Sequence, residues 1–331
     1  MTIIFNKGGK GSVELKELTG SYYANNDFNK IKTELLLETE KLIDLIGEPI
    51  YQRAAAHYLS DRYLATADQT PEEKLNDSLV QHIQLPVALM ASFKFYQSNL
   101  VSHEDGGRKV KIDEANEKMA WEWMLDRDDD AHTRKAFATI DRLIRFLDKT
   151  DLPEWKDSEQ KLATRQLFIN NTEAFNDVYP IDNSPRFFYS SLPFNKEVQR
   201  KVILRTLGAE KYAQLLAYFQ SPPEQDDEAL EKLLALVKTV IPIQVMALAV
   251  KRFPVQVLPE GVVQQYKSLS ASRHASQAAS AEVLKVFTAN LERDAAQALD
   301  DLKRELKSQY PDAHKYQYLP KNDPCNVYFR T

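Results

Sequence analysis

The chain has 331 residues, of which 43% are hydrophobic and 27% are charged, and its formal net charge is −5. This length predicts two domains that each bury a core, and the composition excludes an intrinsically disordered chain. An acidic balance is untypical of a protein that coats nucleic acid, so we expect no sequence-specific nucleic-acid partner. The single cysteine excludes an internal disulfide, and no apolar run is long enough to predict a signal peptide or a membrane span.

The first half of the sequence predicts a short β arm followed by helices. Residues 3–5 and 13–18 are β-prone and flank a glycine-rich turn, which indicates a hairpin or an extended arm. Scarce glycine and apolar residues at helical spacing predict helices over 27–46, 48–64, 70–98, 113–125 and 131–147. Gly47 is expected to end the first helix and Thr70 to cap the third. Between the third and fourth helices, 99–112 predicts a β-hairpin.

The second half predicts a similar series after a polar boundary segment at 148–156. A proline- and aromatic-rich stretch, 167–194, comes first. Helices are then predicted over 196–207, 209–219, 224–250 and 272–308. Residues 253–266 predict a second hairpin or a loop, and 310–331 predicts an extended C-terminal tail that contains three prolines.

The two halves repeat one order of features. GEPIY at 47–51 corresponds to GAEKY at 208–212, and LPVALMA at 85–91 corresponds to IPIQVMA at 241–247. The second motif places a proline inside a long apolar helix in each half, which predicts a kink. Chance similarity between two such helices is the alternative to a duplication. We predict a mainly α fold of two tandem, divergent helical-bundle units, each with a Pro-kinked long helix and a small β-hairpin, over residues 1–150 (with the N-terminal β arm) and 151–331.

The motifs that usually carry chemistry are absent from this sequence. GGKGS at 8–12 lacks the spacing of a phosphate loop, and the acids of 126–130 lack the glycine and glutamate of an EF-hand. The six histidines show no paired metal-ligand spacing, and the lone cysteine has no nucleophile signature around it. We therefore expect no catalytic residues, no cofactor and no metal, and a protein that is not an enzyme. An enzyme with dispersed catalytic residues is the competing hypothesis.

Interaction sites are the remaining candidates. The two predicted hairpins could pair with a neighbouring sheet edge. An aromatic triplet could form a binding surface, although packing between the halves of the chain is the alternative interpretation. The candidate residues are His103, Glu104, Asp105, Gly106, Gly107 and Arg108 in the first hairpin, Pro259, Glu260 and Gly261 in the second, and Phe187, Phe188 and Tyr189.

One stretch of the sequence carries a family resemblance. FINNTEAF at 168–175, YPIDNS at 179–184, the aromatics of 187–194 and LG at 207–208 resemble an uncharacterised family encoded beside virion genes in tailed phages and prophages. The order of helices, kinked long helix, small hairpin and closing helix is similar to that of head–tail connector (adaptor) proteins. The duplication departs from the single-unit connector, so the resemblance leaves the ring stoichiometry undefined.

The resemblance implies a structural phage or prophage protein, with a head–tail connector subunit as the specific expectation. Its partners would then be the portal or neighbouring neck proteins, together with copies of itself in a ring, and no membrane. It would be located in the host cytoplasm during assembly and afterwards in the virion. Another virion assembly protein, or a helical scaffold that binds a protein partner, is the alternative.

Overall fold

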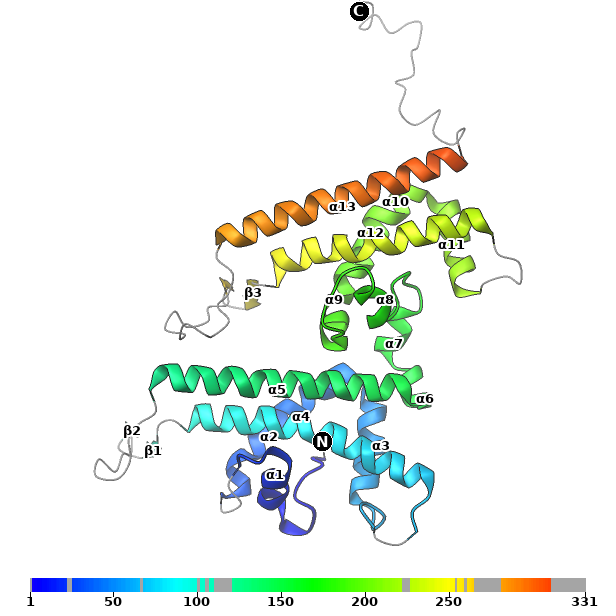
Figure 1. The fold of residues 1–331 in the computed structure, drawn as a ribbon. Helices are drawn as coiled ribbons and strands as arrows, with labels where there is room; N and C mark the ends of the chain where they lie inside the picture. Colours follow the sequence, from blue (N-terminus) through cyan, green and yellow to red (C-terminus); the bar gives the residue numbers. More distant parts are fainter. Residues whose placement is uncertain are drawn as a thin grey trace, which may run out of the picture. The chain divides into compact units, whose positions relative to one another are not determined.

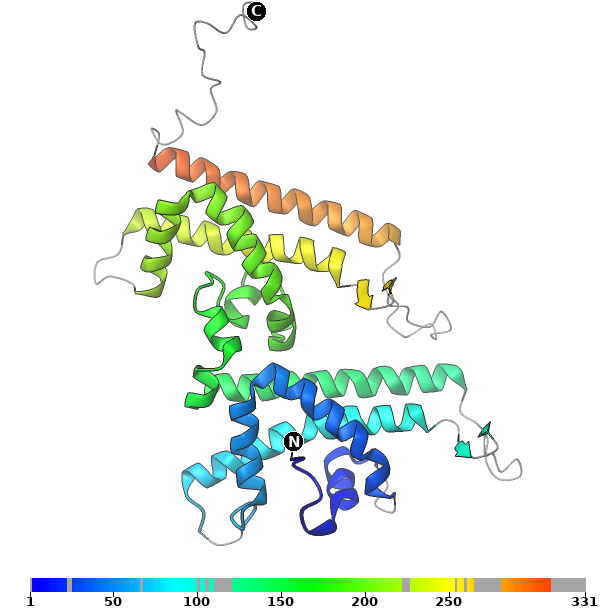
Figure 2. The same ribbon diagram turned by 180° about the vertical axis from the view of Figure 1, so that it is seen from behind.

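The computed structural model describes residues 2–22, 26–65, 68–99, 102–104, 107–109, 121–221, 227–253, 255–258, 261–264 and 281–310. Within these residues the fold is mainly helical (Figures 1 and 2). Its contacts divide the chain into two compact units. The first comprises Met1–Ala163 and Ser184–Tyr189, and the second comprises Thr164–Asn183 and most of the chain from Ser190 onward.

The first unit is built on a pair of long antiparallel helices. Its helices are α1 (Gly11–Thr19), α2 (Phe28–Ile46), α3 (Glu48–Leu59), α4 (Pro71–Ser98), α5 (Glu122–Lys149), α6 (Pro153–Lys156) and α7 (Glu159–Thr164), and the 3-10 turn Lys7–Gly9 precedes them. Helix α4 is the centre of the unit, because α1, α2, α3 and α5 all pack against it. Stacking of His82 on Phe146 at 4.3 Å and a 2.9 Å hydrogen bond from Gln97 to Asp129 show that α4 and α5 run antiparallel.

The core of the first unit follows from apolar residues at helical spacing. Leu79, Val80, Ile83, Val87 and Leu89 of α4 are buried. Leu143, Ile144 and Leu147 of α5 are buried as well. These repeats of three and four residues place one apolar face of each helix against the other. A capping box at Thr70, with Glu73 reaching back to the Thr70 amide, fixes the start of α4 as the sequence predicts.

The second unit repeats this arrangement. Its helices are α8 (Thr172–Asn176), the part of α9 (Pro185–Val198) that follows Tyr189, α10 (Leu204–Leu207), α11 (Ala209–Gln220), α12 (Glu228–Arg252) and α13 (Ala281–Gln309), with a π-helical turn at Gln199–Ile203. Helices α12 and α13 form its long pair. An ion pair between Lys251 and Glu292 and a 3.1 Å hydrogen bond from Gln309 to the Ala229 carbonyl show that this pair is also antiparallel.

The structure and the sequence motifs agree on the internal duplication. Helices α3 and α11 each have 12 residues. Each follows a glycine at positive φ, Gly47 at 89° and Gly208 at 78°. Helices α4 and α12 both continue past an internal proline, Pro86 and Pro242, so the proline does not end either helix.

A short antiparallel strand pair follows the long apolar helix in each unit. In the first unit, β1 (Ser102–Glu104) pairs with β2 (Gly107–Lys109). In the second, β3 (Val255–Leu258) pairs with β4 (Gly261–Gln264). Strands of three and four residues are too short to be stable alone. Their position between two long helices defines one end of each helix pair, which we call the tip (Figure 1).

The β arm predicted near the N-terminus is wrong. Residues 13–18 lie in helix α1 rather than in a strand. Leu15 and Thr19 are buried one turn apart, so the side chains follow the helical period. The Asn6 side chain accepts a hydrogen bond from the Gly11 amide at 2.9 Å and so satisfies a donor at the start of the helix. A Cβ at Gly11 would lie 2.4 Å from the Phe28 ring, so only glycine fits there.

Two further boundaries differ from the predictions. Residues 122–149 form one continuous helix, so the acids of 126–130 lie inside α5 and not in a break between two helices. Helix α3 ends at Leu59, five residues before the predicted end. The first unit also extends beyond residue 150, because Trp155 of α6 is buried and Glu154 forms an ion pair with Arg53 of α3 at 3.1 Å.

Helix α12 is the one described helix that is long and apolar enough to cross a membrane by length and composition. Leu233, Val237, Val240, Ile241 and Val245 give it this composition, and all five are buried within the unit. Because α12 packs along α13, a role in the protein core accounts for its apolar composition.

Candidate functional site

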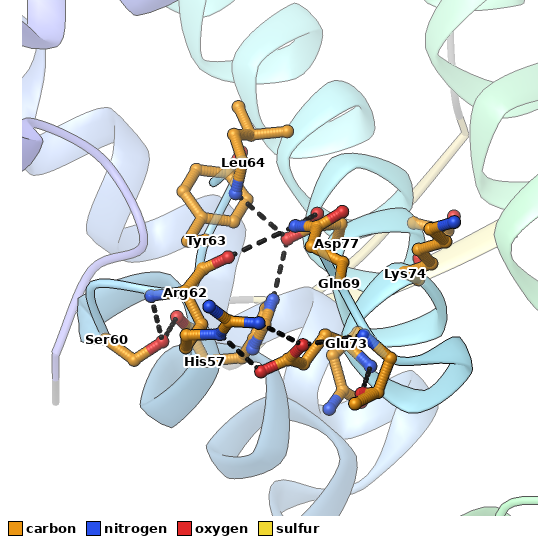
Figure 3. Close-up of polar contacts among 12 residues, drawn as sticks. His57, Ser60, Arg62, Tyr63, Leu64, Gln69, Glu73, Lys74 and Asp77 are labelled. Atoms are coloured by element: carbon orange, nitrogen blue, oxygen red, sulfur yellow. Dashed lines mark hydrogen bonds and ion pairs between the residues drawn. The ribbon is translucent and has the colours of Figure 1, made fainter. Parts of the chain in front are cut away.

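A polar cluster occupies the connection between α3 and α4 (Figure 3). At its centre, Nε2 of His57 lies 2.6 Å from Oδ1 of Asp77, and both side chains are buried. Asp77 also accepts hydrogen bonds from the Leu64 amide at 3.1 Å and from Gln69 Nε2 at 2.7 Å. One carboxylate therefore joins α3, the connection and α4.

Electrostatics keep the central carboxylate ionised. Burial raises the pKa of Asp77, but the hydrogen bonds from His57, Leu64 and Gln69 together outweigh burial and leave the pKa below its ordinary value. Leu64 adopts a positive φ of 52°, which is unfavourable for a leucine. The bond from its amide to Asp77 stabilises this conformation.

The exposed side of the cluster is a second ion pair. Arg62 donates from Nε and Nη2 to the two carboxylate oxygens of Glu73 at 2.5 and 2.8 Å. This bidentate pairing is the main cause of the low pKa of Glu73, about 2, and the Thr70 amide contributes further. Glu73 therefore caps α4 and fastens Arg62 at the same time.

This cluster has a structural role. A histidine that acts as a general base must reach a substrate proton. Here Nε2 of His57 contacts Asp77, and both side chains are buried, so the imidazole is not open to a substrate. The nearby Ser60 hydroxyl donates to the His57 carbonyl oxygen at 2.7 Å, so it does not face the imidazole as a nucleophile. The residues that the structure describes contain no cluster of three or more potential metal ligands.

Beside the cluster, a cavity of about 330 Å³ opens between α1, α4 and α5. Its lining includes Glu14, Glu17, Tyr63, His82, Gln84 and Arg142. Several of these side chains are already engaged, since Glu14 accepts from the Tyr58 hydroxyl at 2.9 Å and Gln84 accepts from the Tyr63 hydroxyl at 3.2 Å. Burial lowers the pKa of His82 despite its bond to the Ser78 carbonyl, so the imidazole is neutral at pH 7. The cavity can hold water or a small polar molecule, but it presents no activated nucleophile.

The residues predicted as interaction sites fall into three groups. His103, Glu104, Gly107 and Arg108 lie in β1 and β2, and Gly261 begins β4. Asp105, Gly106, Pro259 and Glu260 lie outside the described residues. The aromatic triplet lies in α9.

Two of the three members of the aromatic triplet are buried, so they take part in packing and not in a surface. Phe188 is 1% exposed and Tyr189 is also buried. Their rings pack edge to face at 5.4 Å, and Tyr189 contacts Trp155 in the same way at 6.0 Å. An amphipathic helix buries its apolar face, and these two residues lie on that face.

The exposed apolar residues gather instead at the tips of the two helix pairs. At the start of α5, Trp121 is 69% exposed, and Trp123 and Met124 are also exposed. At the start of α13, Val286 is 63% exposed and Phe287 is exposed as well. Clustered exposed apolar side chains of this kind mark interaction sites more often than single ones do.

The charges near the two tips have opposite signs. Residues 122–131 at the start of α5 contain five acids and one base. In the second unit, Arg252 at the end of α12 lies beside Lys196, Arg200 and Lys201, and Glu197 is the single acid among them. Glu197 pairs with Arg252 at 2.6 Å and with Lys201 at 2.7 Å. These two bonds lower its pKa to about 2.

A family model of unknown function, DUF6712, matches residues 42–165 and matches again at residues 203–325. The chain belongs to this family. Each DUF6712 repeat contains the short helix after the glycine, the long helix with the internal proline, the strand pair and the closing long helix. No curated protein and no solved structure matches the chain. The family thus defines the repeat but assigns no role to any residue.

Sequence reasoning predicted hairpins in these regions but not the exposed apolar residues of the tips, because side-chain exposure depends on tertiary packing. The signal was present, since two tryptophans precede a run of acids in the first DUF6712 repeat, and a Val-Phe pair opens the closing helix of the second. Aligning the starts of the closing helices in the two repeats shows large apolar residues in both.

Proposed function

We propose that this DUF6712 protein is a structural, non-enzymatic subunit of a tailed phage or prophage particle, and specifically a head–tail connector that acts through protein–protein contacts. The observation that carries the proposal is the recurrence of exposed apolar residues, Trp121, Trp123 and Met124 in one repeat and Val286 and Phe287 in the other, at the same end of the helix pair. Exposed apolar side chains at the same end of both helix pairs are expected of two contact surfaces, and not of two surfaces that face only water.

Three further features support a structural role. The long helix pairs are rigid elements that can carry contacts over several turns. The buried His57–Asp77 pair and the Arg62–Glu73 pair stabilise the connection between α3 and α4. The strand pairs at the tips remain candidates for contact with a neighbour, as the sequence predicts. In this role the protein would assemble in the host cytoplasm and remain in the particle, in contact with the portal, neighbouring neck proteins or copies of itself.

The test is association with the portal encoded by the same genome. The purified chain, with a mass of 38.0 kDa, is mixed with the portal, and the mass of the complex is measured by light scattering. We expect co-migration with the portal and recovery of the chain from purified particles by mass spectrometry. A chain that is absent from particles and does not bind the portal would refute the proposal and favour a helical scaffold with a different protein partner.

A further inference from the structure

The start of α5 forms an acidic, aromatic surface, which we call the acidic tip. We give this name to Trp121, Trp123, Met124, Asp128 and Asp129, and the exposed Arg127 lies among them. Asp128 is exposed and lies 3.5 Å from His132, and Asp129 accepts a hydrogen bond from Gln97 of α4 at 2.9 Å. Tryptophan is enriched at the energetic centres of interfaces, and a ring of charged residues around it is typical of an interface rim. The acidic tip therefore has the composition of a contact surface.

The second unit carries a surface of complementary charge, which we call the basic cluster. It consists of Lys196, Arg200, Lys201 and Arg252 around Glu197, and these residues, Arg252 apart, border a hollow of about 340 Å³ with Pro193. All four basic side chains are exposed, so four positive charges face one negative charge. Arg252 lies over the Phe194 ring at 5.3 Å, which adds an aromatic floor to the cluster.

We propose that the acidic tip of one copy of this chain docks on the basic cluster of a second copy. The charges are opposite, and each surface combines them with aromatic side chains. Trp121 is 69% exposed. Because each copy carries one surface of each kind, the contact is head-to-tail and extends to a ring or a filament. This inference rests on the proposed structural function and names one of its partners.

Charge reversal on each side separately provides the test. One variant carries Asp128→Lys and Asp129→Lys, and the other carries Arg200→Glu and Lys201→Glu. The full-length chain and both variants are compared by sedimentation velocity over a range of concentrations, at about 50 mM and about 500 mM salt. Lys303→Glu with Lys307→Glu, near the opposite end of α13, is the control for the second variant because both lower the net charge by the same amount. Circular dichroism checks that every variant is folded.

We expect the wild-type chain to sediment above 38.0 kDa at low salt and to dissociate at high salt. Each reversal variant should associate at least about tenfold more weakly, because the first variant loses the negative charge of the acidic tip and the second places negative charge opposite the acidic tip. An equimolar mixture of the two variants should recover association, since the intact acidic tip of one variant can dock on the intact basic cluster of the other. The control should behave as wild type.

Several outcomes would overturn the inference. A wild-type chain that stays at 38.0 kDa at every concentration has no such contact. Reversal variants that associate as wild type, or a mixture that does not recover, place any contact elsewhere. A monomer that binds an oligonucleotide and loses it on Arg200→Glu with Lys201→Glu would assign the basic cluster to nucleic acid. A monomer that still co-migrates with the portal would refute only the self-contact and leave the proposed function standing.

Discussion

Replacing Asp77 with alanine tests whether the polar cluster holds the first unit together. Asp77 is 7% exposed and accepts three hydrogen bonds, from His57 at 2.6 Å, Gln69 at 2.7 Å and Leu64 at 3.1 Å. Leaving a buried or half-buried donor without an acceptor costs about 1 kcal/mol or more. We therefore expect Asp77→Ala to lower the free energy of unfolding of the first unit by about 3 kcal/mol, which is a large part of the stability of an ordinary domain.

Tryptophan fluorescence isolates this effect. The three tryptophans of the chain, Trp121, Trp123 and Trp155, all belong to the first unit. Trp155 is buried, so its emission changes when the first unit unfolds in urea. Asp77→Asn is the matched variant, because it keeps one carbonyl oxygen as an acceptor and should cost about 1 kcal/mol. Asp128→Ala, at an exposed position, should leave the urea midpoint nearly unchanged.

A loss of less than about 1 kcal/mol in Asp77→Ala would refute this reasoning. It would mean that water replaces the carboxylate without cost, and that the Leu64 conformation does not depend on Asp77. An Asp77→Asn variant as unstable as Asp77→Ala would show instead that the negative charge, and not the acceptor geometry, provides the stabilisation.

Three further predictions follow. The folded-state pKa of Asp77 lies below its ordinary value of about 3.9, so its contribution to the free energy of unfolding is complete above that pH and is lost as the pH falls through the folded value. Asp77→Asn should therefore reduce the loss of stability, measured by tryptophan fluorescence, below about pH 4. An unchanged pH profile would contradict this. Gly47→Ala should destabilise the first unit by about 1–3 kcal/mol in urea, because its φ of 89° is unfavourable for alanine. The cause is backbone strain and not a clash, since the nearest atom to an added Cβ is at an ordinary 3.7 Å. A neutral result would show that the backbone relaxes. Leu143→Ala, at a fully buried position, should cost about 2–5 kcal/mol, whereas Leu162→Ala, at an exposed one, should cost less than about 0.5 kcal/mol, and equal midpoints for the two would refute the core assignment.

The elements that sequence reasoning predicted well are those with a strong local cause. The capping threonine and first-turn acids at Thr70 defined the start of α4, and the glycines at 47 and 208 marked the ends of the preceding helices. The order of motifs around Pro86 and Pro242 revealed the duplication, which the two family matches confirm. Each of these signals depends on neighbours in the sequence, so it can be read without a structure.

The failures have a common cause in tertiary packing. Residues 13–18 are β-prone, yet they form a helix because Leu15 and Thr19 are buried one turn apart and Asn6 satisfies the first free amide. The acids of 126–130 look like a helix start, but they continue α5. The sequence left both a surface and a packing role open for Phe188 and Tyr189, and their ring contacts show that they pack. Local propensity is weak enough for such contacts to override it.

The sequence by itself determined that this protein is mainly helical and duplicated, because helical periodicity, caps and repeated motifs depend on residues that are close together in the sequence. Only the tertiary structure decided which side chains meet. His57 and Asp77 are 20 residues apart and form one buried pair. Arg252 of α12 pairs with Glu197, 55 residues away in the sequence, and so joins the cluster of Lys196, Arg200 and Lys201. Such groupings depend on how helices pack, and exposure at the tips depends on what the rest of the unit leaves uncovered.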